Sequence, residues 1–133
     1  MNPTDWSRLE RAAKAASARA YCPYSRFAVG CAVLTADGAI ASGCNVENAS
    51  YGLTSCAERN AIFRAVGDGA TSVAALVVYT PTPAPVTPCG ACRQVIAEFG
   101  RDARVRAICD GPDTIDYTIG ELLPAEFTLE KPK

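Results

Sequence analysis

The chain has 133 residues, of which 49% are hydrophobic and 20% charged, and its formal net charge is −1. This composition is typical of one compact domain, residues 1–133, and it excludes a disordered chain. Because no basic run is interleaved with aromatic residues, the sequence argues against a long nucleic acid as partner and favours a small neutral ligand.

Segments with helical or strand-like apolar spacing, separated by turn residues, predict nine elements in the order α-β-β-α-β-α-β-β-α. In chain order these are a helix at 4–20, strands at 27–34 and 39–44, a helix at 55–66, a strand at 72–79, a helix at 90–99, strands at 104–109 and 114–119, and a helical turn at 118–123. Such an order predicts an α/β fold in which helices cover the faces of a mixed sheet.

Local features refine these predictions. We expect Thr4 or Asp5 to cap the first helix. The unbroken apolar run at 72–79 is typical of a central strand that is covered on both faces. Residues 45–54 predict a loop. In the helix at 55–66, four apolar side chains are expected to face inward: Ala61, Ile62, Phe63 and Val66.

The cysteine and histidine content limits both the compartment and the chemistry. The first ten residues carry no secretory pattern, and no apolar stretch reaches membrane-spanning length, so we expect a cytoplasmic protein without membrane contact and with reduced cysteines. The absence of histidine excludes Ser-His-Asp and Cys-His catalytic sets and every zinc site that uses histidine. Four of the seven cysteines are expected to be small buried hydrophobes: Cys22, Cys31, Cys44 and Cys109.

The other three cysteines lie in two motifs, Ser55-Cys56-Ala57-Glu58-Arg59 and Pro88-Cys89-Gly90-Ala91-Cys92-Arg93-Gln94. Each motif falls where a loop is expected to become a helix, and a helix N-terminus stabilises thiolates through its free N–H groups and partial positive charge. Three thiolates can hold Zn²⁺ and leave its fourth tetrahedral position open for water. The pair of motifs therefore favours zinc-assisted hydrolysis.

Glu58 and Arg59 fit this interpretation. Glu58 follows Cys56 by two residues, and helix positions i and i+2 do not face one another, so Glu58 is better placed to exchange protons with water than to ligate the metal. Arg59 can donate to the sulfurs and offset the net charge of Zn²⁺ with three thiolates, 2 − 3 = −1. Each residue also has a purely structural interpretation: Glu58 could complement the dipole at the helix N-terminus, and Arg59 could be a solvated helix residue.

Two other kinds of protein share part of this pattern. A loop followed by Cys-Gly-Ala-Cys and a helix also resembles a thiol–disulfide exchange site, but that interpretation leaves the motif around Cys56 unexplained. A closed structural Cys₄ zinc site would need a fourth ligand, for which Cys22, Cys44 or Cys109 are candidates.

The two motifs resemble those of cytidine deaminases, in the short homotetrameric branch of the cytidine/deoxycytidylate deaminase family. Three further segments are similar to that family: Tyr24–Gly30, Asn45–Gly52, and Leu122-Leu123-Pro124 with Phe127 after it. The resemblance implies a three-layer α-β-α fold with a mixed five-stranded sheet. It also implies zinc-dependent hydrolytic deamination of cytidine, and of deoxycytidine, to the uridine nucleoside and ammonia in pyrimidine salvage.

The resemblance also implies a role for each site residue. Cys56, Cys89 and Cys92 would bind zinc, and Glu58 would carry protons from water to N3 of the pyrimidine and to the departing amine. The substrate contacts would be Asn45 and Glu47 on the ribose hydroxyls, Phe27 against the base, the backbone of Ala57 on the pyrimidine, and Tyr51 and Phe127 in the pocket of a neighbouring subunit. The expected assembly is a homotetramer with shared active sites.

Two other kinds of deaminase are related to this family. A tRNA-editing adenosine deaminase is expected to use a histidine ligand, which this sequence lacks. A blasticidin-type deaminase shares the zinc motifs and is therefore the alternative function. It fits less well because it should not need the pair Asn45 and Glu47.

Overall fold

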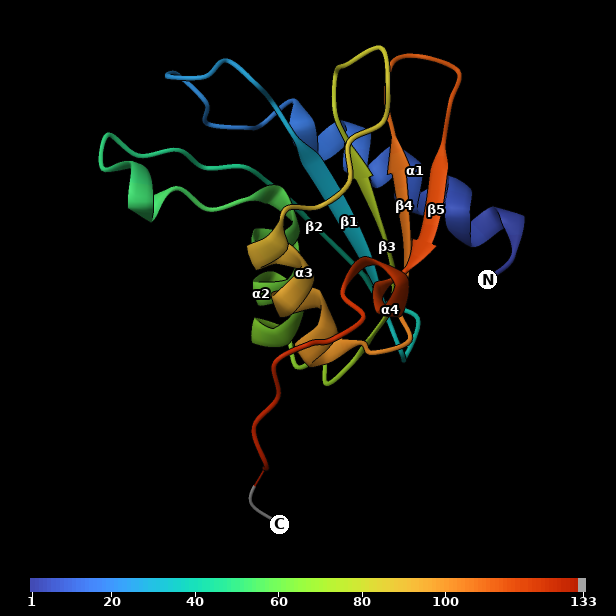
Figure 1. Cartoon of the computed structure of the whole chain (residues 1–133). Coiled ribbons are helices and arrows are strands. Elements are labelled where there is room, and N and C mark those ends of the chain that lie inside the picture. Colours follow the sequence, from blue (N-terminus) through green and yellow to red (C-terminus); the bar gives the residue numbers. More distant parts are fainter. Residues whose placement is uncertain (132–133) are drawn as a thin grey trace.

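The structure is a computed structural model that describes residues 1–131. Its centre is a five-stranded sheet in the order β2-β1-β3-β4-β5 (Figure 1). The strands are β1 (Gly30–Thr35), β2 (Ile40–Cys44), β3 (Val73–Tyr79), β4 (Arg104–Ile108) and β5 (Ile115–Thr118). Only the β3–β4 pair is parallel among these neighbours, so the sheet is mixed, and the prediction that the apolar run at 72–79 forms a central strand is confirmed.

Helices cover both faces of the sheet, which gives the predicted three layers. α1 (Pro3–Ser17) lies on one face, behind the sheet in Figure 1. α2 (Ala57–Gly67), α3 (Gly90–Phe99) and the short α4 (Ile119–Leu122) lie on the other. A one-turn 3₁₀ helix, η1 (Tyr51–Leu53), interrupts the predicted loop at 45–54. Each face buries its own apolar cluster, one centred on Leu9 and Val77 and the other on Ile62 and Ile96.

Two glycines allow the helices to approach the sheet closely. A Cβ at Gly30 on β1 would lie 1.9 Å from the carbonyl oxygen of Ala13 in α1. A Cβ at Gly43 on β2 would lie 2.5 Å from the backbone nitrogen of Ala61 in α2. Any larger residue at either position would push a helix away from the sheet. Because α2 begins beside Cys56, the close approach at Gly43 also fixes the position of the first cysteine motif.

The structure corrects the predicted boundaries and caps of α1. The helix ends at Ser17 rather than at residue 20. Its N-cap is Asn2, whose side chain accepts from the backbone nitrogen of Asp5 at 2.9 Å, and Pro3 follows in the first turn. Thr4 and Asp5 are therefore wrong as caps, because a proline at the first helical position, which needs no N–H partner there, moves the helix start towards the N-terminus.

The predicted inward face of α2 is half right. Ala61 and Ile62 are fully buried, whereas Phe63 is 52% and Val66 38% exposed. The buried side chains recur at Ala57, Ala61 and Ala65, a spacing of four residues, so the apolar face is centred on alanines. Phe63 and Val66 lie outside that face.

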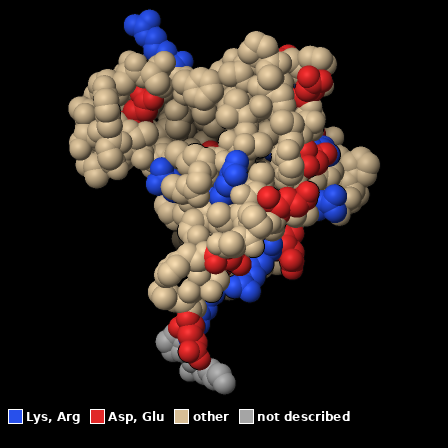
Figure 2. Space-filling view, viewed as in Figure 1, with Lys and Arg blue, Asp and Glu red and all other residues tan. Residues whose placement is uncertain are grey.

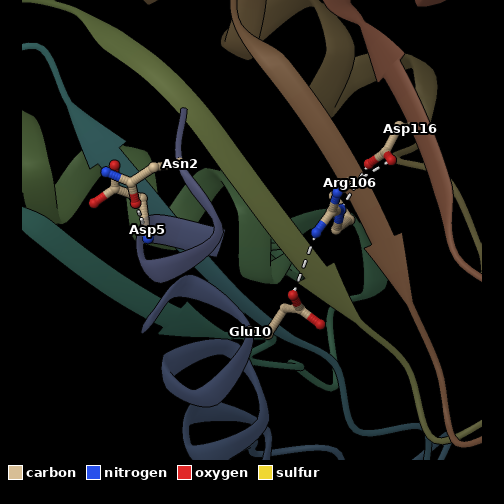
Figure 3. A network of polar contacts seen from close by, with 5 residues as sticks. All are labelled: Asn2, Asp5, Glu10, Arg106 and Asp116. Atoms are coloured by element: carbon tan, nitrogen blue, oxygen red, sulfur yellow. Dashed lines mark hydrogen bonds and ion pairs between the residues drawn. The ribbon is translucent and has the colours of Figure 1, made fainter. Parts of the chain in front are cut away.

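A polar network ties α1 to the far edge of the sheet. Arg106 on β4 donates to Asp116 on β5 at 2.7 and 3.2 Å and pairs with Glu10 on α1 at 3.3 Å (Figure 3). Its guanidinium carbon also lies 4.0 Å from the centroid of the Trp6 ring. The network joins three elements through one side chain, on the face of the sheet opposite α2 and α3.

Charges are dispersed over the surface. In Figure 2, blue and red side chains are interspersed on an otherwise neutral face, without a basic stripe that could follow a phosphate backbone. Within residues 1–131, none of the helices has the length and apolar character needed to cross a membrane.

Candidate active site

A cavity of about 280 Å³ opens where the N-terminus of α2 meets the end of β3. Loops complete its wall: one precedes β1, one joins β2 to α2, and the proline-rich loop 80–88 leads to α3. The lining residues are Ser25, Phe27, Val29, Asn45, Glu47, Thr54, Cys56, Ala57, Glu58, Val78, Thr80, Val86, Thr87 and Cys89. Seven of the ten residues predicted for the site, Arg59 apart, therefore line one cavity, and two of the three candidate zinc ligands are among them.

The three predicted ligand cysteines lie together. Cys56 is the N-cap of α2, Cys89 is the N-cap of α3, and Cys92 lies one turn into α3. Their sulfur atoms are all within 4.8 Å of one another, and those of Cys89 and Cys92 are 3.4 Å apart. The prediction that both motifs occupy helix N-termini is confirmed. Two helix ends therefore direct their partial positive charge at one sulfur cluster.

The cluster fits a zinc ion. With Zn–S bonds of about 2.3 Å, tetrahedral geometry places the sulfurs about 3.8 Å apart, which is close to the separations seen here. Among residues 1–131 the donor set is three soft sulfur ligands without a fourth side chain, so the coordination sphere would stay open on one side. Cys89 and Cys56 line the cavity, and the open side can therefore face a substrate.

Arg59 lies against this cluster. Its Nη2 donates to the sulfur of Cys56 at 3.3 Å and to the carbonyl of Thr54 at 3.5 Å. Its Nε is buried and has no hydrogen-bond partner within the described chain. A guanidinium held beside the sulfurs offsets part of the negative charge that three thiolates would concentrate there.

The pKa values of the cysteines follow from these contacts. A hydrogen bond from Cys92 and the nearby Arg59 guanidinium lower the pKa of Cys56 to about 5. The same hydrogen bond, together with burial, raises the pKa of Cys92 well above its usual value. Of this pair, Cys56 is therefore the cysteine whose thiolate is favoured.

Glu58 is the buried carboxylate of the cavity. It lies in the first turn of α2 and is only 5% exposed. Burial, followed by the neighbouring Cys56 thiolate, raises its pKa above the ordinary value for glutamate. A raised pKa makes the carboxylate a stronger base than an exposed glutamate, which favours proton transfer in general acid–base catalysis.

Asn45 holds the loop that carries Phe27, just before β1; the strand predicted from residue 27 begins only at Gly30. Its amide oxygen accepts from the backbone nitrogen of Val29 at 2.9 Å, and its amide nitrogen donates to the carbonyl of Phe27 at 2.8 Å. Each amide atom keeps one further hydrogen-bonding position, because an asparagine offers two acceptor and two donor sites. Asn45 thus has one donor and one acceptor free for a ligand, while Phe27, 39% exposed, lines the same cavity.

Glu47 lies at the mouth of the cavity. It accepts hydrogen bonds from the backbone nitrogens of Tyr24 and Ser25 at 3.0 and 3.1 Å, and from the hydroxyl of Ser25. These bonds, the Ser25 hydroxyl first, lower the pKa of Glu47. The side chain is therefore a fixed carboxylate that remains charged at neutral pH.

Tyr51 and Phe127 do not line this cavity. Tyr51 is 77% exposed and lies in a neighbouring hollow with Tyr24 and Asn48, whereas Phe127 is 67% exposed and packs near Glu98 beside α3. In Figure 1, the segment after α4 leaves at the end of the molecule away from the loops of the site. Within one chain, neither ring covers the cavity.

The remaining cysteines stay apart from the cluster. Cys31 and Cys109 are buried as predicted, while Cys22 and Cys44 are partly exposed. All seven cysteines are free, and in residues 1–131 the grouping of metal-ligating side chains holds Cys56, Cys89 and Cys92 without a fourth member.

Several lining residues carried no signal in the sequence. Thr80 is 2% exposed at the end of β3, and its hydroxyl lies 2.7 Å from that of Thr82, which in turn donates to the carbonyl of Ala84 at 2.7 Å. This chain of hydroxyls holds the proline-rich loop. The prolines of that loop restrict its backbone, but its polar support depends on folded contacts. Ser25 could have been singled out, since it lies in the segment Tyr24–Gly30 that the resemblance covers.

Known proteins share this architecture and sequence. The family described as "Cytidine and deoxycytidylate deaminase zinc-binding region" matches residues 3–108. A cytidine deaminase of Halalkalibacterium halodurans is 52% identical over 84% of this chain and 85% of its own, and one of Sporosarcina psychrophila is 47% identical over 95% and 93%. The crystal structure of cytidine deaminase from Burkholderia pseudomallei has a TM-score of 0.88 and 46% identity, covering 96% of this chain and all of its own. The chain therefore belongs to the cytidine and deoxycytidylate deaminase family.

Proposed function

We propose that this protein hydrolyses cytidine, and deoxycytidine, to the corresponding uridine nucleoside and ammonia. The observation that carries the proposal is a buried carboxylate, Glu58, which shares one cavity with two of three clustered cysteines. The overall reaction replaces the amino group at C4 with oxygen from water. Named cytidine deaminases of 47% and 52% identity support the choice of substrate.

Cys56, Cys89 and Cys92 would hold the zinc ion, with Arg59 donating to the sulfur of Cys56. Bound zinc supplies a Lewis acid that makes water a nucleophile at neutral pH. The helix N-termini at Cys56 and Cys89 stabilise the thiolate ligands.

Glu58 moves the protons. Its raised pKa, caused chiefly by burial, allows it to take a proton from the attacking water and deliver it to N3 of the pyrimidine. It then takes the remaining proton of the oxygen that has bonded to C4 and passes it to the amino group, which leaves as ammonia while that oxygen becomes the carbonyl of the product. Because bulk water is largely excluded at a side chain that is 5% exposed, these protons stay between the reactants.

The loop residues recognise the nucleoside. Phe27 packs against the base, and the backbone of Ala57 meets the pyrimidine edge. Asn45 and Glu47 bind ribose hydroxyls with the hydrogen-bonding positions that their protein partners leave free. A site built to hydrogen-bond hydroxyls rejects ligands that lack them, so free cytosine should be a poor substrate.

The charge of the pocket favours a nucleoside over a nucleotide. Among the described residues, neither the cavity nor the hollow beside Glu47 has a lysine or arginine in its lining, whereas both contain a carboxylate. A phosphate near Glu47 would meet a like charge and find no cation to neutralise it. The deoxycytidylate branch of the family is therefore the less suitable assignment.

Assembly would complete the site. We propose that residues 1–133 are one catalytic domain and that four copies form a cytoplasmic homotetramer with shared active sites. Phe63, Tyr51 and Phe127 are 52%, 77% and 67% exposed, and further copies of the chain that pack on them would remove these rings from water. Tyr51 and Phe127 would then cover the cavity of a neighbouring subunit.

The test is direct. The purified protein is analysed for zinc and then mixed with cytidine, deoxycytidine, deoxycytidine monophosphate, cytosine and blasticidin S, and ammonia and the deaminated product are measured. We expect about one zinc per chain and turnover of both nucleosides at rates far above those of the other three compounds. Preferential turnover of blasticidin S or of the monophosphate would replace the proposed substrate, and zinc without any deamination would contradict the proposal.

A further inference from the structure

Ser25 is the polar link between the loop that carries Phe27 and the carboxylate of Glu47. Its hydroxyl donates to Oε2 of Glu47 and accepts from the backbone nitrogen of Phe27 at 3.0 Å. Its own backbone nitrogen donates to Oε1 of Glu47 at 3.1 Å. One exposed serine therefore makes three hydrogen bonds to two residues of the proposed substrate pocket.

Counting acceptor positions shows what Glu47 has left for a ligand. A carboxylate oxygen accepts about two hydrogen bonds. Oε1 is filled by the backbone nitrogens of Tyr24 and Ser25, and Oε2 holds the Ser25 hydroxyl. One position, on Oε2, remains free, and the hydroxyl of Ser25 determines the direction in which it points.

The backbone around Ser25 is shaped to make this contact. Arg26, the next residue, has φ 57°, a left-handed conformation that is unfavourable for a side chain of its kind, and its nitrogen donates to the carbonyl of Cys22 at 2.8 Å. Within residues 1–131, it is the one non-glycine residue with positive φ. Such strain persists only where surrounding contacts hold it; here the Arg26 nitrogen is held by Cys22, and the next nitrogen, that of Phe27, donates to the Ser25 hydroxyl.

We propose that Ser25 is a positioning residue, which orients Oε2 of Glu47 so that it accepts one sugar hydroxyl of the substrate. This inference rests on the proposed function. Ser25 does not touch the reacting atoms at the base, so its contribution belongs to the binding of the sugar. Loss of its hydroxyl leaves Glu47 with the two backbone donors on Oε1, but Oε2 is then free to turn away from the ligand.

The first experiment uses two product ligands that differ only in the sugar. Inhibition constants of uridine and 2′,3′-dideoxyuridine are measured against cytidine turnover for the unmodified protein, Ser25→Ala, Ser25→Thr and Ser50→Ala. Ser50 is a matched control because it is an exposed loop serine whose hydroxyl makes no hydrogen bond in the described residues. Melting temperature and zinc content verify that each variant is folded and loaded.

We expect Ser25→Ala to weaken uridine about fivefold to twentyfold, in keeping with a hydrogen bond to a charged group, and to change dideoxyuridine less than about twofold. KM for cytidine should rise by a similar factor with kcat within about twofold. Ser25→Thr, which keeps the hydroxyl, should restore most of the affinity, and Ser50→Ala should have no effect. In a Glu47→Gln background, adding Ser25→Ala should cost less than about twofold, because coupled residues are not additive.

The outcomes separate the two proposals. If the unmodified protein does not deaminate cytidine, the proposed function fails. If it does, and Ser25→Ala leaves uridine binding unchanged or weakens both ligands by the same factor, Ser25 does not act through Glu47 and the inference is overturned. Full additivity with Glu47→Gln would overturn it as well.

Discussion

The two walls of the cavity are built by different means. The wall that carries Cys56, Ala57 and Glu58 belongs to the first turn of α2 and packs against the sheet, with Ala57 fully buried and Glu58 5% exposed. The opposite wall, with Phe27 and Glu47, consists of loops that side-chain-to-backbone hydrogen bonds hold in place. The first is positioned by the core of the fold, and the second by a few polar contacts near solvent.

This difference separates chemistry from recognition. Burial raises the pKa of Glu58, whereas hydrogen bonds from Cys92 and Arg59 lower the pKa of the half-buried Cys56. The first turn of α2 fixes the positions of both groups. Exposed loops cannot exclude water by themselves, and Tyr51, at 77% exposure, leaves the loop wall open in one chain. Changes in the buried wall should therefore affect zinc or kcat, and changes in the loop wall should affect KM.

Removal of a buried ligand should have the largest effect. Cys92→Ala is expected to lose zinc and all measurable deamination, and to lower Tm by about 10 °C or more, because metal-binding free energy is also folding free energy. Metal analysis and thermal unfolding check this expectation. The control is Cys44→Ala, which removes a partly exposed thiol outside the cluster and should retain zinc. Loss of zinc in Cys44→Ala would instead indicate a closed Cys₄ site.

Arg59 tests the electrostatic part of the buried wall. Arg59→Ala removes the donor to the Cys56 sulfur and should lower zinc affinity or activity about 10- to 100-fold, as is typical for residues that support metal ligands. Arg64→Ala on the same helix removes an exposed arginine that makes no ion pair in the described chain. Chelator competition should separate the two variants. Equal zinc affinities would show that the sulfur contact contributes nothing.

The loop wall is tested through assembly. If Phe127 covers a neighbouring pocket, Phe127→Ala should raise KM for cytidine about fivefold or more while zinc stays bound, since truncation of a central aromatic at an interface costs more than about 1 kcal/mol. Mixing Phe127→Ala with Glu58→Gln subunits should restore part of the activity, because a mixed assembly can contain an intact composite site.

Two results would contradict shared sites. One is verified exchange of subunits without any recovered activity. The other is full activity in a particle that light scattering shows to be a monomer.

The smallest kinetic effect is expected far from both walls, at the network in Figure 3. Arg106→Met should lower the free energy of unfolding by about 1–2 kcal/mol, because it removes two ion pairs and the contact with the Trp6 ring. kcat and KM should be unchanged. Arg104→Met, at an exposed arginine of the same strand without an ion pair in residues 1–131, should be nearly neutral in urea unfolding. A kinetic defect in Arg106→Met would show that the far face influences the site.

The sequence predicted the elements around the buried wall better than the contacts of the loop wall. The positions of Cys56 and Cys89 at helix starts were predictable because an aperiodic loop ends and helical apolar spacing begins at each of them. The apolar run at 72–79 likewise marked the central strand. The inward placement of Phe63 was wrong because hydrophobicity alone does not distinguish a core from a contact surface.

Other features depend on contacts between distant segments. The hydroxyl pair of Thr80 and Thr82, and the capture of Ser25 by Glu47 across 22 residues, exist only when the loops have folded together. The cap at Asn2 differs from the predicted Thr4 or Asp5 because Pro3 starts the helix before either of them. The roles of Tyr51 and Phe127 stay predictions, since they concern a second chain.

The kinetics of zinc-loaded Glu58→Gln test the central claim most directly. This change keeps the size of the buried side chain and removes its proton-transfer capacity. We expect zinc content, Tm and uridine affinity to stay near those of the unmodified protein, while kcat for cytidine falls by at least the ~10²–10⁴ typical for loss of a general acid–base group. Retention of more than about a tenth of kcat would contradict the assignment of Glu58 as proton carrier.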